Sequence, residues 1–181
     1  MLRIPLEAMA GTLAAFESGP HRCELVADIH GVKFVNDSKA TNLDAVRQAL
    51  LSVPAGRSGG PNVWLIAGGR DKAFEYYEIG PLLSQRVKGA YLIGETREKI
   101  RAAWSLFTPC TLADSLIEAV SDAAHHAAAG DVVLLSPACS SFDQFRNYQH
   151  RGEVFRQAVL DLRNAADNAG GRTAPARTAL N

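Results

Sequence analysis

Hydrophobic residues change their spacing several times along the chain, and each change predicts a switch between strand and helix. Runs with the length and pattern of strands occur at residues 23–27, 32–35, 63–67, 90–93 and 132–135, with a short candidate edge strand at 110–112. Apolar residues at helical spacing occur at residues 6–16, 43–51, 77–87, 96–107, 112–129 and 143–162. The third of these helices contains Gly80 and Pro81, which mark a boundary or a first turn within it.

The order of these elements predicts an α/β fold with a Rossmann-like, doubly wound and mostly parallel sheet. Residues 63–67 form a continuous apolar run, which is typical of a parallel strand buried on both faces. The first two strands are joined by a short turn at His30 and Gly31, so we expect an antiparallel N-terminal hairpin. The chain has 181 residues, 47% of them hydrophobic, which is enough to bury the core of one domain.

Residues 36–42, with the sequence N-D-S-K-A-T-N, lie where a predicted strand ends and a predicted helix begins. Thr41 or Asn42 can cap this helix, and the N–H groups of its first turn favour an anion. Two further loops, residues 68–72 and 136–142, also follow strand ends. In a doubly wound sheet such loops converge on one rim, where ligands bind.

The side chains of these three loops suit an anionic ligand. They comprise two cations, one carboxylate and four hydroxyls: Lys39, Lys72, Asp37, Thr41, Ser136, Ser140 and Ser141. Such a set can bind a carboxylate or a phosphate. The local pattern leaves a plainer alternative open, in which residues 36–42 are a capped helix start with a solvated loop, and Gly68 and Gly69 form a tight turn that binds nothing.

Charge, cysteine content and hydropathy exclude several classes of protein. The formal net charge is +0, so nothing indicates a nucleic-acid partner or a polybasic membrane surface. The three cysteines, Cys23, Cys110 and Cys139, fit neither a metal site nor a disulfide framework, which favours the cytoplasm. The first residues do not read as a signal peptide, and no run approaches the roughly 20 apolar residues of a membrane span. Residues 167–181 are predicted to form a disordered tail.

Common catalytic motifs are missing. The chain contains neither the P-loop pattern G-x-x-x-x-G-K-[ST] nor the dinucleotide pattern G-x-G-x-x-G. A hydrolase with Cys139 or Ser141 as nucleophile, served by His125 or His126, is one alternative. It lacks the G-x-S-x-G elbow, and the histidines fall in an Ala-rich helix where a surface position is expected.

Four motifs occur in an order that is specific to one family. These are His21-Arg22, N-D-S-K-A-T-N at 36–42, the Gly68-Gly69 loop ending at Lys72, and L-L-S-P-A-C-S-S-F-D-Q-F at 134–145. Together they resemble the C-terminal domain of the Mur ligases, most closely the MurD type, which adds D-glutamate. The resemblance assigns residues 21–166 to this domain, and residues 1–20 to a linker helix from a central domain that the chain lacks.

The resemblance implies an ATP-dependent ligase of peptidoglycan synthesis. In that reaction ATP phosphorylates the carboxylate of UDP-N-acetylmuramoyl-L-alanine, and the amine of D-glutamate attacks the acyl phosphate. By resemblance, Thr41 and Lys72 hold the α-carboxylate of D-glutamate. Ser141 and the backbone near Phe142 and Tyr148 hold its side-chain carboxylate. A dicarboxylate needs two donor-rich ends, which agrees with the residues present.

The resemblance also directs Arg22, Asp37 and Lys39 toward ATP, with Asp37 at the ribose and Lys39 as the catalytic candidate. The family's P-loop and Mg²⁺ ligands belong to the central domain. We therefore expect this chain alone to be inactive, monomeric and without a metal site. The alternative is a stand-alone, non-catalytic module that binds glutamate or a nucleotide.

Overall fold

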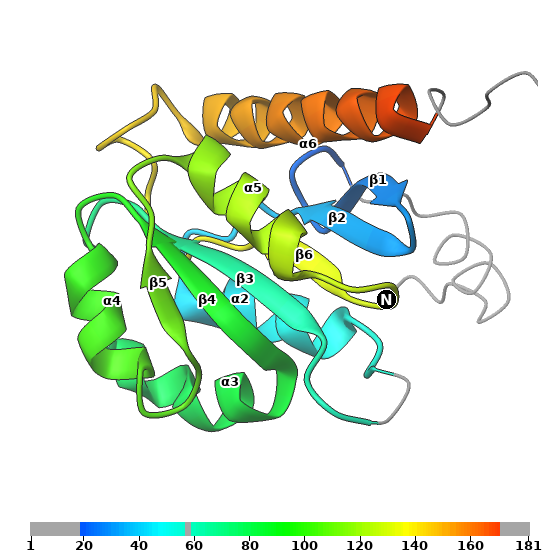
Figure 1. Cartoon of the computed structure of the whole chain (residues 1–181). Coiled ribbons are helices and arrows are strands. Elements are labelled where there is room, and N and C mark those ends of the chain that lie inside the picture. Colours follow the sequence, from blue (N-terminus) through cyan, green and yellow to red (C-terminus); the bar gives the residue numbers. More distant parts are fainter. Residues whose placement is uncertain (1–18, 57–58, 171–181) are drawn as a thin grey trace, which may run out of the picture.

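The computed structural model describes residues 19–56 and 59–170, and these form a six-stranded sheet flanked by helices (Figure 1). The strands are β1 (Glu24–Ile29), β2 (Val32–Asn36), β3 (Val63–Gly68), β4 (Val87–Ile93), β5 (Cys110–Leu112) and β6 (Val132–Leu135). They lie in the order β1-β2-β6-β3-β4-β5. Only the β1–β2 pair is antiparallel, and every other neighbouring pair is parallel. The prediction of a mostly parallel sheet with an N-terminal hairpin is confirmed.

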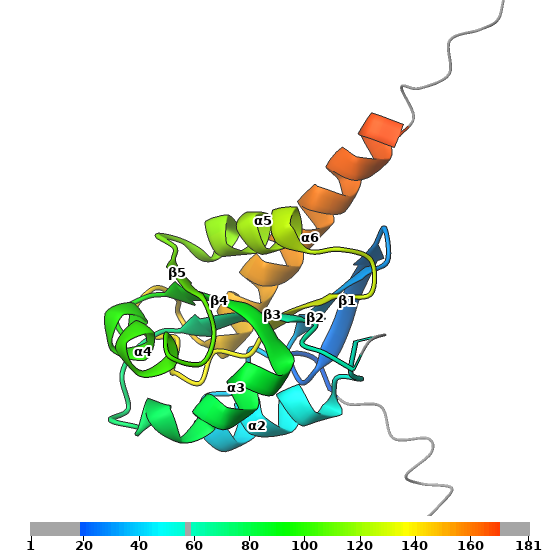
Figure 2. The same cartoon turned by 60° about the horizontal axis from the view of Figure 1, so that its bottom comes forward.

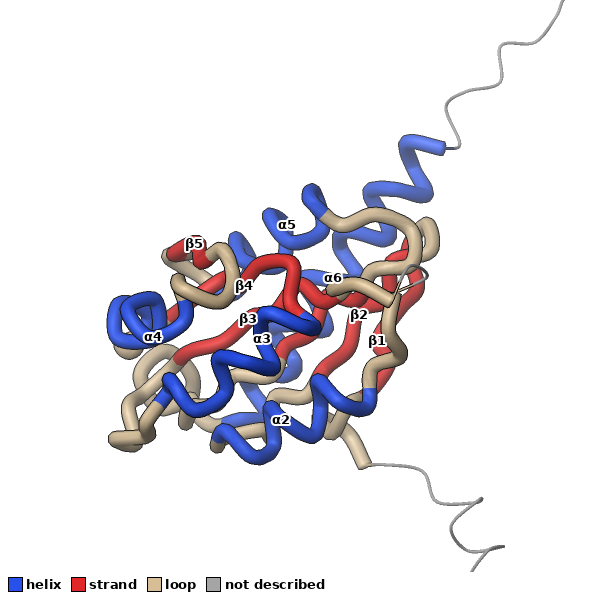
Figure 3. The backbone as a smooth tube through the Cα atoms, turned by 90° about the horizontal axis from the view of Figure 1, so that it is seen from below, coloured by secondary structure: helices blue, strands red, loops and turns tan. Residues whose placement is uncertain are grey.

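Helices cover both faces of this sheet, as a doubly wound fold requires (Figure 2). One face carries α2 (Leu43–Ser52), the 3₁₀ helix η1 (Tyr76–Ile79), α3 (Gly80–Arg86) and α4 (Arg97–Trp104). The view from below shows α2 and α3 lying across that face (Figure 3). The other face carries α5 (Leu116–His126) and α6 (Tyr148–Gly170).

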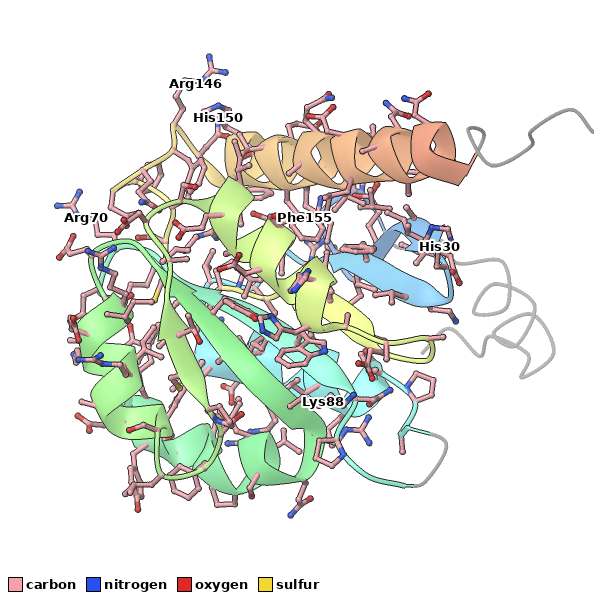
Figure 4. All side chains as sticks on the ribbon, viewed as in Figure 1. His30, Arg70, Lys88, Arg146, His150 and Phe155 are labelled. Carbon is pink, nitrogen blue, oxygen red and sulfur yellow. The ribbon has the colours of Figure 1, made fainter. Side chains whose placement is uncertain are left out.

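The two cores arise from the alternation of side chains along each strand. In β3, Leu65 packs among the helices of the first face and Ile66 among those of the second, and both are fully buried. Helix α2 closes the first core with a stripe of four residues: Leu43, Val46, Ala49 and Leu50. Phe155 of α6 fills the second core between α6 and α5 (Figure 4). Burial of each large side chain contributes roughly 1.5–3 kcal/mol.

Several predicted helix boundaries are wrong, because local hydrogen bonds override the apolar spacing. The segment 112–129 gives only α5: Leu112 belongs to β5, and the Ser115 hydroxyl caps the helix by accepting from the Glu118 N–H. The helix predicted at 77–87 divides into η1 and α3, with Pro81 in the first turn of α3. The helix predicted at 96–107 is shorter, as α4.

The last helix is displaced toward the C-terminus. It was expected over 143–162, but α6 begins at Tyr148 and continues to Gly170. Asn147 accounts for the start, because its side-chain oxygen accepts the His150 N–H at 2.8 Å, as an N-cap does. Residues 167–170, predicted as part of the tail, are therefore helical. The predicted helix 6–16 and the remainder of the tail, residues 171–181, lie outside the described residues. No helix in the described ranges could cross a membrane.

Candidate functional site

The loops after β2, β3 and β6 meet at one end of the sheet and border a pocket of about 500 Å³. The pocket is lined by Thr41, Arg70, Asp71, Lys72, Ser140, Ser141, Phe142 and Tyr148. All five residues that were expected to hold D-glutamate are therefore brought together. Sequence reasoning missed the lining role of Arg70 and Asp71, although both lie in the glycine loop that it singled out.

Two successive glycines lie at the end of β3, and the second of them allows the loops after β3 and β6 to touch. Gly68 and Gly69 have φ of 113° and 142°. A Cβ on Gly69 would lie 2.3 Å from the Ser140 carbonyl oxygen, too close for any other residue. Because Gly69 has no Cβ, the Arg70 N–H can donate to the Ser140 carbonyl oxygen at 2.9 Å. Gly69 is required by this close approach of two backbones, whereas a Cβ on Gly68 would meet the Ile93 carbonyl oxygen of β4 at 2.1 Å. The loop after β3, which carries Lys72, is called the first wall of the pocket, and the loop after β6, which carries Ser141, is called the second wall.

The first wall is linked to the loop after β2. The ammonium of Lys72 donates to the Thr41 carbonyl at 3.2 Å. Of the two candidates for the N-cap of α2, the structure selects Asn42, whose side-chain oxygen accepts the Ala45 N–H at 2.8 Å. The Thr41 side chain is therefore not used as the cap and lies half-buried at the pocket.

Asp71 would repel an anion in this pocket if its charge were uncompensated. The carboxylate instead pairs with the Lys99 ammonium at 2.8 Å and accepts the Ala73 N–H at 2.9 Å. The bond from Lys99 is the main cause of the lowered pKa of Asp71. Arg70 and Lys72 then remain as a cationic pair at the pocket, which favours an anionic ligand. Arg70 projects outward at this end of the molecule (Figure 4).

The three residues expected to face a nucleotide also lie together. The Lys39 N–H donates to the His21 carbonyl at 3.1 Å, and the Cys23 N–H donates to Asp37 Oδ1 at 3.2 Å. These bonds hold His21 and Cys23, the two neighbours of Arg22 in the sequence, against the 36–42 loop. The Lys39 ammonium lies 5.2 Å from the ring centre of Tyr148, so this cluster adjoins the pocket.

Asp37 is buried, with 7% of its surface exposed. Its second oxygen accepts the Ser136 hydroxyl at 2.9 Å. Burial is the largest influence on its carboxyl and raises the pKa, while the bond from Ser136 opposes the rise. Asp37 thus ties the start of β1 to the loop after β6, and each of its oxygens keeps lone-pair capacity for a ligand.

Sequence reasoning missed Arg151, which forms hydrogen bonds to the loop after β2 and to the loop after β6. Its guanidinium is fully buried and donates to the Ser38 carbonyl at 2.8 Å and the Cys139 carbonyl at 3.1 Å. A third bond reaches the Ser38 hydroxyl at 3.1 Å. A signal existed in the sequence, because Arg151 occupies a position in the buried stripe of α6, four residues before Phe155.

The structure argues against the hydrolase alternative. Cys139 is fully buried, and burial raises the pKa of its thiol, so a thiolate nucleophile is disfavoured. Its sulfur lies 3.2 Å from the Tyr76 hydroxyl and 3.4 Å from the Thr96 hydroxyl. His126 instead bonds Tyr91 at 2.9 Å on the exposed side of α5, as the sequence predicted for that helix. The Cys139 thiol is thus poorly suited as a nucleophile, and His126 is bonded to Tyr91 rather than to it.

The fold and site define a Rossmann-like domain with a pocket at its strand ends that is lined by two cationic side chains, Arg70 and Lys72. Residues 21–139 match the family described as Mur ligase, glutamate ligase domain. The chain therefore belongs to this family.

Individual relatives agree with that assignment. A protein of Acidobacterium capsulatum named UDP-N-acetylmuramoylalanine--D-glutamate ligase is 47% identical, and the match covers 90% of this chain and 34% of that protein. A protein of the same name from Chlorobaculum tepidum is 48% identical, and the match covers 86% of this chain and 32% of that protein. The chain thus spans about a third of the length of these curated relatives. The structure of MurF ligase from Thermotoga maritima in complex with ADP has a TM-score of 0.55 at 21% identity, covering 83% of this chain and 34% of that one. This similarity shows the fold.

Proposed function

We propose that this chain is the substrate-binding C-terminal domain of an ATP-dependent ligase that adds D-glutamate to UDP-N-acetylmuramoyl-L-alanine in peptidoglycan synthesis. The observation that carries the proposal is the pocket itself. Thr41, Lys72 and Ser141 come from three loops and meet around one space with a cationic pair. The names of the 47% and 48% identical relatives support D-glutamate as the ligand.

The pocket suits both ends of a dicarboxylate. Lys72 and Thr41 would bind the α-carboxylate, since the ammonium already holds the Thr41 carbonyl. Ser141 and the backbone beside Phe142 and Tyr148 would bind the side-chain carboxylate. Charge-assisted hydrogen bonds of this kind are roughly twice as strong as neutral ones.

ATP would lie beside this pocket, against Arg22, Asp37 and Lys39. Asp37 offers oxygens to a ribose, and the two cations offset phosphate charge. Lys39 would act as the catalytic residue, because its ammonium can stabilise the charge that develops in forming an acyl phosphate. The described residues contain no cluster of three or more His, Cys, Asp or Glu side chains, so Mg²⁺ would be held by other parts of the full-length enzyme. We place that enzyme in the cytoplasm, as a monomer.

A titration of the ¹⁵N-labelled chain with D-glutamate, followed by NMR, tests the pocket. We expect saturable shifts at the amides of residues 41, 72 and 141, and weaker binding of L-glutamate, because inversion at Cα misplaces one group. NMR suits this test because an isolated domain lacks contacts that closure onto a second domain would add. Equal shifts from the two enantiomers, or shifts confined to distant residues, would contradict the assignment.

The chain alone should release no phosphate. It contains no P-loop, so it has no phosphate cradle of that type. A phosphate-release assay with ATP, D-glutamate and UDP-N-acetylmuramoyl-L-alanine is expected to match the enzyme-free background. Turnover above that background would show that the chain carries a complete active site and would overturn this part of the proposal.

A further inference from the structure

Besides the Arg70–Ser140 backbone bond and the Thr96 hydroxyl, a buried tyrosine hydroxyl contacts side chains of both walls of the pocket. Tyr76, at the start of η1, is only 2% exposed. Its oxygen lies 3.2 Å from Oδ1 of Asp71, on the wall that carries Lys72. The same oxygen lies 3.2 Å from the sulfur of Cys139, on the wall that carries Ser141.

Proton positions along this connection follow from the chemistry of its members. An ionised Asp71 can only accept, so the Tyr76 hydroxyl donates to it. The Tyr76 oxygen then has a lone pair left to accept the Cys139 thiol proton. Burial raises the pKa of both the tyrosine hydroxyl and the thiol, so both keep their protons at neutral pH. The result is a continuous chain of donors from Cys139 to Asp71.

The position of the hydroxyl is itself fixed. The indole N–H of Trp104 donates to the Tyr76 carbonyl at 2.7 Å, and Trp104 is fully buried. The ring of Phe74 meets the Tyr76 ring edge to face at 6.5 Å, and the Lys99 ammonium lies 5.4 Å from its centre. A tyrosine held on three sides can set the distance between the groups that bond its oxygen.

We propose that Tyr76 is a positioning residue of this site, whose hydroxyl sets the separation of Lys72 from Ser141. Because this role concerns the binding of the ligand, the inference rests on the proposed function. Loss of the hydroxyl leaves the Asp71 carboxylate held by Lys99 and Ala73, and leaves the Cys139 sulfur in contact with Thr96. The two walls then keep the Arg70–Ser140 backbone bond and the Thr96 hydroxyl, which contacts Gly69 and Cys139, but they lose the hydroxyl that contacts both Asp71 and Cys139.

Tyr76→Phe removes this hydroxyl and keeps the ring, and Tyr77→Phe is the matched control. Tyr77 is the next residue of η1. It is 56% exposed, and its ring packs on Phe107. In the ¹⁵N-labelled chain, Tyr76→Phe should shift amide signals in both 70–73 and 139–142 and speed hydrogen exchange of the Ala73 amide. The Kd for D-glutamate should rise about three- to ten-fold, as expected for one lost hydrogen bond. Tyr77→Phe should change none of these.

A double-mutant cycle with Cys139→Ala separates positioning from general destabilisation. If the two hydroxyl contacts act together, the second substitution adds less than a factor of two to the Kd of Tyr76→Phe. Wild-type affinity in a folded Tyr76→Phe chain, or shifts limited to one wall, would overturn the inference. If the wild-type chain binds no D-glutamate, the proposed function fails for this chain, and the amide shifts alone decide whether Tyr76 couples the walls.

Discussion

Lys72→Met should weaken D-glutamate binding by about ten- to hundred-fold, because a charge-assisted bond to a carboxylate contributes roughly 1.5–3 kcal/mol. The ammonium is exposed at the pocket and makes one neutral contact, to the Thr41 carbonyl. Its removal should therefore leave the fold intact. The measurement is an NMR titration with D-glutamate, together with thermal unfolding of the same sample.

Lys33→Met provides the matched control for this substitution. Lys33 is also exposed, but it belongs to β2 near the opposite, amino-terminal end of the parallel strands. It should leave the Kd unchanged within a factor of two. A Lys72→Met chain that binds D-glutamate as well as wild type would remove Lys72 from the site. Loss of binding in both variants would point instead to a general electrostatic effect of the domain.

The pocket is positive although the chain is formally neutral, and pairing explains this. Asp71 is balanced by Lys99, and its further bonds go to the Ala73 N–H and the Tyr76 hydroxyl. Asp37 is buried behind the loops. The carboxylates are thus held by internal partners, while Arg70 and Lys72 face the pocket. Net charge carries no information about this, because it does not record which charges are already neutralised.

The six strands and the mostly parallel character of the sheet were predictable because apolar runs determine strands almost directly, although β4 begins at Val87, three residues before the predicted run. The edge strand at Cys110–Leu112 was found from three residues, and the run at 63–67 correctly indicated burial on both faces. Helix ends were less predictable. Ser115 and Asn147 fix the starts of α5 and α6 by accepting backbone N–H groups, and apolar spacing does not register such caps.

The rule that loops after parallel strands share a rim predicted that the three loops meet. The five residues expected to hold D-glutamate came from the family resemblance, and they do line one pocket together. Their supports could not be found in the same way. Tyr76 lies just before the helix predicted at 77–87, and its contact with Cys139 spans 63 residues of sequence. Only the folded chain brings such partners together.

Arg151→Met should lower the stability of the chain by about 3–5 kcal/mol, because each buried carbonyl left without its donor costs about 1–3 kcal/mol and the buried hydroxyl loses a bond as well. Burial lowers the pKa of Arg151 to about 10, so it is still charged at neutral pH. Its bonds satisfy the buried carbonyls of Ser38 and Cys139. Methionine would leave these oxygens unpaired in a space without water. Urea unfolding should show an earlier midpoint, and the melting temperature should fall by roughly 6–20 °C.

Arg163→Met is the matched control, since Arg163 lies on the same helix with its side chain exposed. It should change stability by less than about 0.5 kcal/mol. Arg151→Lys keeps a charge but cannot reach all three oxygens, so an intermediate loss is expected. In that folded variant the D-glutamate affinity should also fall, because Ser38 and Cys139 belong to the loops that carry Thr41 and Ser141. Unchanged stability in Arg151→Met would mean that the loops are held by their own contacts and that the buried guanidinium adds nothing.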